Sequence, residues 1–222
     1  MSDQISFVWN EEKLSLLPEK AILLPEHHTL LIADLHFGKT SHFRKNGLPI
    51  PAKSAEADFH ALNQVIRRYN PEKVYFLGDL FHSEENQEWP FLIELLASFT
   101  NTRFYLIPGN HDLVSIPNGS STNFFIAEET VQLGNIFLCH DPAEVPKNQP
   151  SICGHIHPGH RLKGKGRQSV MLPAFYIRQE LILMPAFGAL TGLVTPDLPT
   201  STSVAIVSPS GVLWVPKRKF GT

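Results

Sequence analysis

Residues 29–36 read TLLIADLH, an apolar run that ends abruptly in polar side chains. The five residues 29–33 are almost all apolar, which is typical of a strand buried on both faces. Asp34 and His36 follow at the point where this strand should end. Polar side chains at the carboxyl end of a buried strand are the usual material of a site in an α/β protein.

The same arrangement recurs twice more in the first half of the chain. Strands are predicted over residues 74–77 and 104–107, and each closes in a glycine-containing polar turn. Apolar residues at helical spacing predict helices between the strands, over residues 59–69 and 89–99. This order predicts a parallel sheet with right-handed crossovers.

The second half of the chain predicts strands with few helices between them. Six are expected, over residues 136–139, 151–153, 170–177, 181–184, 204–207 and 212–215. We therefore expect two sheets packed face to face, with helices covering their outer faces. No linker divides the chain, so residues 1–222 are expected to form a single domain.

Composition excludes several classes of protein. The longest apolar runs, such as residues 181–190, are far shorter than the roughly twenty residues of a membrane-spanning helix. The first residues lack signal-peptide features, and two cysteines make no disulfide framework, so a cytoplasmic protein is expected. The formal charge of −2 argues against holding nucleic acid by bulk charge but leaves room for a local basic groove.

Polar residues gather at five predicted strand ends. They are Asp34 and His36, then Asp79, then Asn110, His111 and Asp112, then His140 and Asp141, and finally His155 and His157. Imidazole, carboxylate and amide groups suit divalent ions such as Mn, Fe, Zn, Ni or Co. The set is too large for one tetrahedral ion, whereas two ions sharing a carboxylate would use it fully.

These segments carry a family pattern. In order they read D-x-H, G-D, G-N-H-D, H and G-H-x-H, between Asp34 and His157. The chain thereby resembles the calcineurin-like metallophosphoesterases, although the gap from Asp34 to Asp79 is longer than in many members. The resemblance implies a four-layer αββα sandwich of two mixed sheets flanked by helices.

A narrower resemblance rests on residues 33–39, 43–49, 78–83 and 184–192. These stretches are similar to the ligase-associated DNA-damage-response endonucleases of the PdeM type. That branch implies a Mn-dependent phosphodiesterase acting on DNA, functionally associated with a DNA ligase and a helicase.

The resemblance also implies roles for individual residues. Asp34, His36 and His157 would hold one ion, Asn110, His140 and His155 the other, and Asp79 would bridge the two. A hydroxide bridging the ions would attack the phosphorus. His111 would act as general acid, and Asp112 would orient its ring.

Substrate contacts are expected from residues near these motifs. The candidates are Lys39, Arg44, His82, Arg161 and Lys163. A structural role for His82 and a merely solvated loop around Arg161 and Lys163 remain open alternatives. Cys139 and Cys153 are expected to pack in the core.

The sequence therefore predicts a two-metal phosphodiesterase, a DNA endonuclease of DNA repair. One alternative is a hydrolase of a small phosphoester, such as a nucleotide or cyclic nucleotide, which the weak charge favours. Another is a protein-interaction scaffold that has kept only the fold. A scaffold would be expected to lose ligands, and the pattern here keeps every one.

Overall fold

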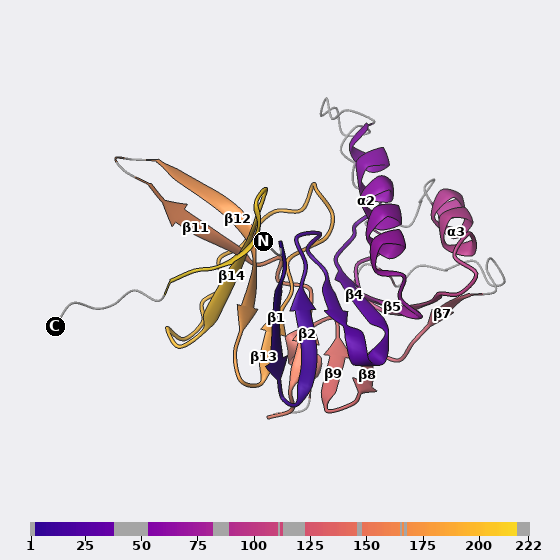
Figure 1. Ribbon diagram of the computed structural model, residues 1–222, viewed down its shortest axis with the longest axis horizontal. Helices are drawn as coiled ribbons and strands as arrows, with labels where there is room; N and C mark the ends of the chain where they lie inside the picture. The colour runs from indigo at the N-terminus through magenta and orange to yellow at the C-terminus, as the bar shows by residue number, and fades with distance from the viewer. Residues whose placement is uncertain are drawn as a thin grey trace.

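Two mixed β-sheets packed face to face form the centre of the molecule (Figure 1). The computed structural model describes residues 3–37, 53–81, 89–110, 112, 123–145, 148–164, 166 and 168–216. The stacked sheets confirm the layered α/β architecture expected from the sequence.

The first sheet has the strand order β1-β2-β3-β4-β5-β6-β7. Its strands are β1 (Ile5–Trp9), β2 (Glu12–Leu16), β3 (Ile22–Leu24), β4 (Thr29–Ala33), β5 (Lys73–Leu77), β6 (Arg103–Ile107) and β7 (Phe124–Ile126). Strands β1 to β4 pair antiparallel, whereas β4 to β7 pair parallel. The predicted parallel strands are confirmed, and three antiparallel strands extend them on one side.

The second sheet has the order β15-β14-β12-β13-β10-β9-β8, with β11 paired to β12. Its strands are β8 (Thr130–Leu133), β9 (Ile136–Cys139), β10 (Ser151–Cys153), β11 (Gly159–Lys163), β12 (Ser169–Ile177), β13 (Leu181–Leu183), β14 (Ser203–Ser208) and β15 (Gly211–Trp214). All six strands predicted for this half are present, and β9, β10 and β13 pair parallel.

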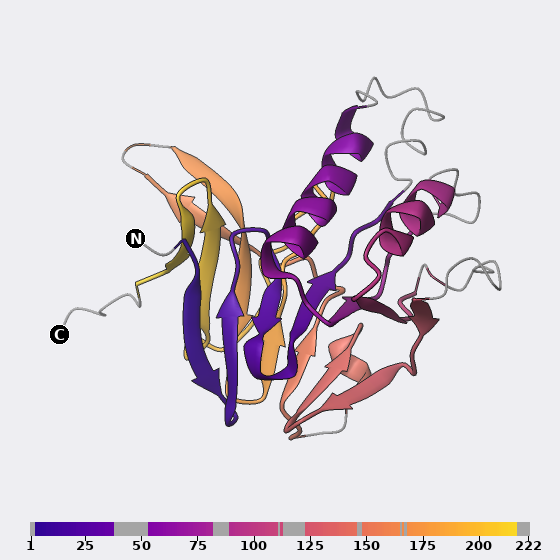
Figure 2. The same ribbon diagram turned by 45° about the vertical axis from the view of Figure 1, so that its right-hand side comes forward.

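Two helices, α2 (Lys53–Tyr69) and α3 (Trp89–Ala97), cover the outer face of the first sheet (Figure 2). They connect β4 to β5 and β5 to β6, because parallel neighbours need a crossover connection. Short 3-10 helices, η1 (Pro25–His27) and η2 (Pro142–Glu144), complete the helical elements described.

The outer face of the second sheet differs in detail from the expected helical layer. In the described part of the chain no α-helix covers it. The connection from β9 to β10 contains only η2, while the longer connection from β10 to β13 runs through the β11–β12 hairpin. Val145, just after η2, packs there against a cluster that includes Cys139 and Cys153.

Alternating side chains divide the core into layers. In β5, Val74 and Phe76 face the helices, whereas Tyr75 and Leu77 face the second sheet. Cys139 and Cys153 are fully buried and lie opposite each other in register, with their thiols 2.7 Å apart. The expected core packing of both cysteines is confirmed.

Among the described residues, no helix is both long enough and apolar enough to cross a membrane.

Candidate metal centre

The loops that follow β4, β5, β9 and β10 meet at one edge of the two sheets. Ligand atoms of Asp34, His36, Asp79 and His157 lie within 4.8 Å of one another, and so do those of Asp79, His140 and His155. Asp79 belongs to both groups. The structure thus brings together six of the seven residues expected to hold metal, in the two sets that the family resemblance implies.

The first group, around His36 and His157, points its donor atoms at a common centre. The two Nε2 atoms lie 3.0 Å apart, and the rings meet edge to face at 85°. Asp34 Oδ1 lies 3.5 Å from His157 Nε2, and Asp79 Oδ2 lies 3.8 Å from His36 Nε2. Imidazole nitrogens and carboxylate oxygens converging in this way fit a divalent cation.

The second group, around His140, has a defined tautomer. His140 Nδ1 donates a hydrogen bond of 3.0 Å to the Leu77 carbonyl, which can only accept. In the neutral ring, Nε2 therefore carries no hydrogen, and it faces Asp79 Oδ1 at 3.5 Å and His155 Nδ1 at 3.0 Å. An outer hydrogen bond that fixes the free nitrogen is the usual arrangement of a metal-binding histidine.

Left-handed backbone conformations orient the candidate ligands. Positive φ angles occur at Asp34 (53°), His36 (50°), Asp79 (47°), His155 (68°) and His157 (50°). Each costs a non-glycine residue on the order of 1 kcal/mol, and such strain gathers at functional sites. The strands thus end in turns that aim these side chains inward at an energetic cost.

Glycines make room for the ligands. A Cβ atom on Gly78, whose φ is +71°, would lie 2.2 Å from His140 Nδ1. A Cβ atom on Gly154 would lie 2.7 Å from Asp34 Oδ2. The glycines of the G-D and G-H-x-H motifs are therefore needed because a ligand occupies the space of their missing side chains.

Asp141 is a neighbour that the sequence analysis gave no role. Its Oδ2 lies 3.7 Å from His155 Nε2, and its Oδ1 accepts from the Ala143 backbone at the start of η2. The carboxylate can orient His155, as carboxylates often do for metal-binding imidazoles. Its position directly after His140 was the available signal.

Asp112 joins the loops that follow β5 and β6. One carboxylate oxygen accepts from the backbone N–H groups of Leu80 (3.0 Å) and Phe81 (3.3 Å), and the other from Gly109 (3.0 Å). Burial raises the pKa of Asp112 to about 6, although these N–H groups favour its charged form. The Asp112 carboxylate therefore holds the loops after β5 and β6 together through their backbone N–H groups.

Asn110 follows β6 in an exposed turn. His111 lies outside the described residues, so its predicted general-acid role and its orientation by Asp112 stay predictions. Lys39, Arg44 and His82 also lie outside the described residues.

Arg161 and Lys163 lie on β11, which begins two residues after His157. Both are exposed, and they share one face of the strand because they are two residues apart. The β11–β12 hairpin projects away from the body of the molecule (Figure 1). These two cations thus lie on an arm of the second sheet, apart from the two ligand groups.

The segment after β13 makes backbone hydrogen bonds to the end of β4 and to Asp34. Phe187 N donates to the Ala33 carbonyl at 2.8 Å, and Gly188 N donates to that of Asp34 at 3.2 Å. A Cβ atom on Gly188 would lie 2.3 Å from the Leu35 carbonyl oxygen. This close approach explains a glycine in the stretch 184–188.

The paired groups of imidazoles and carboxylates, held at the edge of two stacked mixed sheets, define a metal-dependent phosphoesterase. The model of the calcineurin-like phosphoesterase family matches residues 27–170, more than half of the chain. The chain belongs to this family, which uses divalent metal ions.

Two solved structures are similar to this chain to different degrees. The nuclease MPE of Pseudomonas putida is 26% identical, with a TM-score of 0.80, and the match covers 96% of this chain and 100% of that one. YfcE, a phosphoesterase from E. coli, is 16% identical with a TM-score of 0.44, over 86% of this chain and 99% of that one. No curated protein sequence matches the chain.

Proposed function

We propose that this protein is a two-metal phosphodiesterase that cleaves DNA, and that it works as an endonuclease in DNA repair in the cytoplasm. One observation carries the two-metal proposal: Asp79 is shared by two separate groups of ligand atoms. The likeness to a nuclease over almost the whole chain supports a nucleic-acid substrate.

In this proposal Asp34, His36 and His157 hold one ion, and His140 and His155 hold the other together with Asn110. When bound, the ions supply Lewis acidity, which lowers the pKa of water and neutralises charge on the phosphate. Manganese is the proposed ion because the family branch that the chain resembles implies it; the nitrogen and oxygen donors themselves also suit Fe, Zn, Ni or Co.

The protein's own groups set the geometry of this centre. Asp79 turns Oδ2 toward His36 and Oδ1 toward His140, so each of its two oxygens faces a different group of ligands. Asp34 accepts from the backbone N–H of His155 at 3.1 Å and 3.0 Å through its two oxygens, which ties the first group to the loop of the second. Such links hold both groups in place before substrate binds, so little reorganisation is needed during the reaction.

DNA binding must rely on local positive charge because the chain carries a formal charge of −2. We assign contacts with the sugar-phosphate backbone of DNA to Arg161 and Lys163 on the β11–β12 hairpin, and to Lys39, Arg44 and His82. Phosphate contacts position a nucleic acid without reading its sequence. Functional association with a DNA ligase and a helicase rests on the family branch alone.

A cleavage panel tests the proposal. Purified protein with Mn²⁺ is incubated with plasmid, with single-stranded, duplex and nicked DNA, and with bis- and mono-nitrophenyl phosphate. We expect DNA cleavage and faster hydrolysis of the diester than of the monoester. Fast monoester cleavage without nicking at low salt would instead establish a small-phosphoester hydrolase.

A second measurement addresses the scaffold alternative. Elemental analysis should find close to two ions per chain after reconstitution. Fewer than one ion, with no hydrolysis under any divalent cation, would establish a non-catalytic fold. His111→Ala should keep the metal and lose turnover on DNA, because the proposed general acid is not a ligand.

A further inference from the structure

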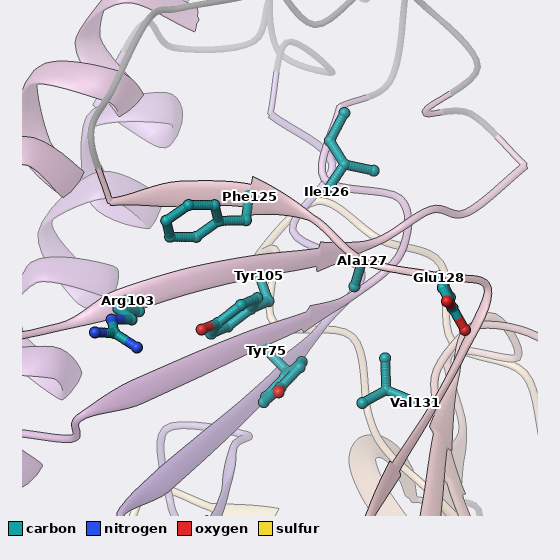
Figure 3. A pocket seen from close by; sticks show the side chains of 8 residues that line it. All are labelled: Tyr75, Arg103, Tyr105, Phe125, Ile126, Ala127, Glu128 and Val131. Atoms are coloured by element: carbon teal, nitrogen blue, oxygen red, sulfur yellow. The ribbon is translucent and has the colours of Figure 1, made fainter.

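An aromatic pocket lies on the first sheet, and none of the candidate metal ligands lines it. It is lined by Tyr75 of β5, Arg103 and Tyr105 of β6, Phe125 and Ile126 of β7, and then Ala127, Glu128 and Val131 (Figure 3). Its volume is about 650 Å³, within the range of small-molecule sites. None of these residues has a role in the proposed hydrolysis.

Three aromatic rings form a ladder across neighbouring strands of this pocket. Tyr75 pairs in register with Tyr105, and Tyr105 with Phe125. The ring centroids lie 4.9 Å and 5.5 Å apart, with interplanar angles of 17° and 28°. Tyr75 is buried, whereas Phe125 at the outer end is 43% exposed. The ladder therefore ends in a ring that solvent or a ligand can reach.

Polar groups lie on both sides of the aromatic ladder. Figure 3 shows Arg103 at the start of β6 and Glu128 beyond the end of β7, with the rings between them. Within the described part of the chain, neither side chain makes a hydrogen bond or ion pair, and neither do the hydroxyls of Tyr75 and Tyr105. A cation, a carboxylate and two hydroxyls are thus available to a ligand.

This combination fits a nucleotide. An aromatic wall favours a planar ring, and base stacking on aromatic side chains tolerates any base. The Arg103 guanidinium is suited to a phosphate, and the Glu128 carboxylate can accept from an exocyclic amine. A purely apolar partner would leave both charges without compensation.

The pocket and the metal centre share one strand, because β5 contributes Tyr75 to the pocket and leads to Asp79. Tyr75 precedes Asp79 by four residues, which span at most about 13 Å of extended chain. That distance corresponds to at most about four steps of 3.4 Å along one strand of a duplex. We propose that the pocket formed by Tyr75, Arg103, Tyr105, Phe125 and Glu128 binds one nucleotide of the DNA substrate, a few nucleotides from the scissile phosphate. This inference rests on the proposed function.

Binding is tested in the metal-free protein, where hydrolysis cannot occur. Deoxyadenosine 5′-monophosphate, deoxyadenosine and inorganic phosphate are titrated separately and followed by NMR of the tyrosine and phenylalanine rings. We expect the nucleotide to shift the resonances of Tyr75, Tyr105 and Phe125, and to bind more tightly than either fragment.

Two variants and a matched control sharpen this test. Phe125→Ala should weaken nucleotide and nucleoside about equally, by roughly five-fold or more, because a stacking surface is lost. Arg103→Ala should weaken binding of the nucleotide but leave the affinity for the nucleoside within twofold of the wild-type value. Phe91→Ala removes a 63% exposed ring from α3, on the helical side of the sheet, and should change neither. On DNA, Phe125→Ala should raise KM more than it lowers kcat.

Several results would overturn the inference. They are absence of nucleotide binding at millimolar concentration, resonance shifts confined to the metal centre, or an Arg103→Ala variant with unchanged affinity. Light scattering that shows a dimer dissociated by Phe125→Ala would make the pocket an interface between copies. If DNA is cleaved but the pocket binds nothing, only this inference fails. If no phosphodiester is hydrolysed, the proposed function fails separately.

Discussion

His36 and His157 place their Nε2 atoms 3.0 Å apart although 121 residues separate them along the chain. Two ring nitrogens at this distance cannot both carry a hydrogen along the line between them. The two nitrogens need either a hydrogen bond from one ring to the other or a cation between them. His140 and His155 repeat it in the second group, again at 3.0 Å.

Metal binding should therefore stabilise the folded protein. At a free-ion concentration of about 100 times Kd, each site adds roughly 2.7 kcal/mol. For a chain of this size, each kcal/mol raises Tm by roughly 2–4 °C. We expect the Tm measured with Mn²⁺ to be higher than the Tm measured with EDTA by several degrees. Equal Tm values in the two conditions would contradict the assignment of these residues as ligands.

Removing the carboxylate of Asp79 should weaken metal binding at both ligand groups, because both contain it. Asp79→Ala is expected to lower bound metal to less than one ion per chain and to reduce phosphodiester hydrolysis at least a hundredfold. Metal content is measured by elemental analysis after dialysis. Asp197→Ala, which changes an exposed carboxylate, is the matched control and should retain both properties. Normal hydrolysis by Asp79→Ala would refute the bridging role.

Adding one methyl group at Gly78 should displace His140. The new Cβ would overlap the imidazole, and the residue's positive φ disfavours any side chain. Gly78→Ala should cost roughly 1–3 kcal/mol and weaken metal binding at the second group. Gly192→Ala is the control, since nothing lies within 4 Å of its added Cβ. Urea unfolding and metal titration compare the two; similar behaviour would show that His140 has freedom to move.

Truncation of Asp112 should destabilise the fold as well as the reaction. Asp112→Ala leaves the N–H groups of Leu80, Phe81 and Gly109 without their acceptor. Unmet buried donors of this kind cost about 1 kcal/mol or more each, so a loss of roughly 3 kcal/mol is expected. Urea unfolding of the metal-free protein isolates this effect. Wild-type stability combined with lost activity would favour a purely catalytic role instead.

Lys20 should make stability rise with pH in the alkaline range. Its ammonium donates to the Phe187 carbonyl, and burial lowers its pKa to about 8, against an opposing attraction from Asp58. Between the folded pKa near 8 and the unfolded value of 10.5, the unfolded chain binds more protons, so deprotonation favours folding.

The effect is measured as a difference between two proteins. From pH 7 to pH 10, the free energy of unfolding of the wild type should rise by up to roughly 2 kcal/mol relative to Lys20→Met. The comparison cancels the titration of tyrosines that both proteins share. Parallel pH profiles for the two would show that Lys20 keeps its ordinary pKa.

Several elements escaped the sequence analysis for a physical reason. Strands β1, β2 and β3 form the antiparallel side of the first sheet, and their apolar residues find partners only after the sandwich forms. Phe7 of β1, for example, packs against Trp214 of β15, with ring centroids 5.8 Å apart. The aromatic ladder was equally hidden, because Tyr75, Tyr105 and Phe125 become neighbours only through strand pairing.

The sequence by itself determined the layered α/β class and the set of candidate ligands. Short continuous apolar runs and polar residues directly after them are local signals, so neither requires knowledge of distant contacts. Tertiary structure alone decided which groups share Asp79, which nitrogen of His140 is free, and what Asp112 holds. Those features depend on pairing between loops far apart in the chain, and on left-handed turns at ligand positions that local preference disfavours.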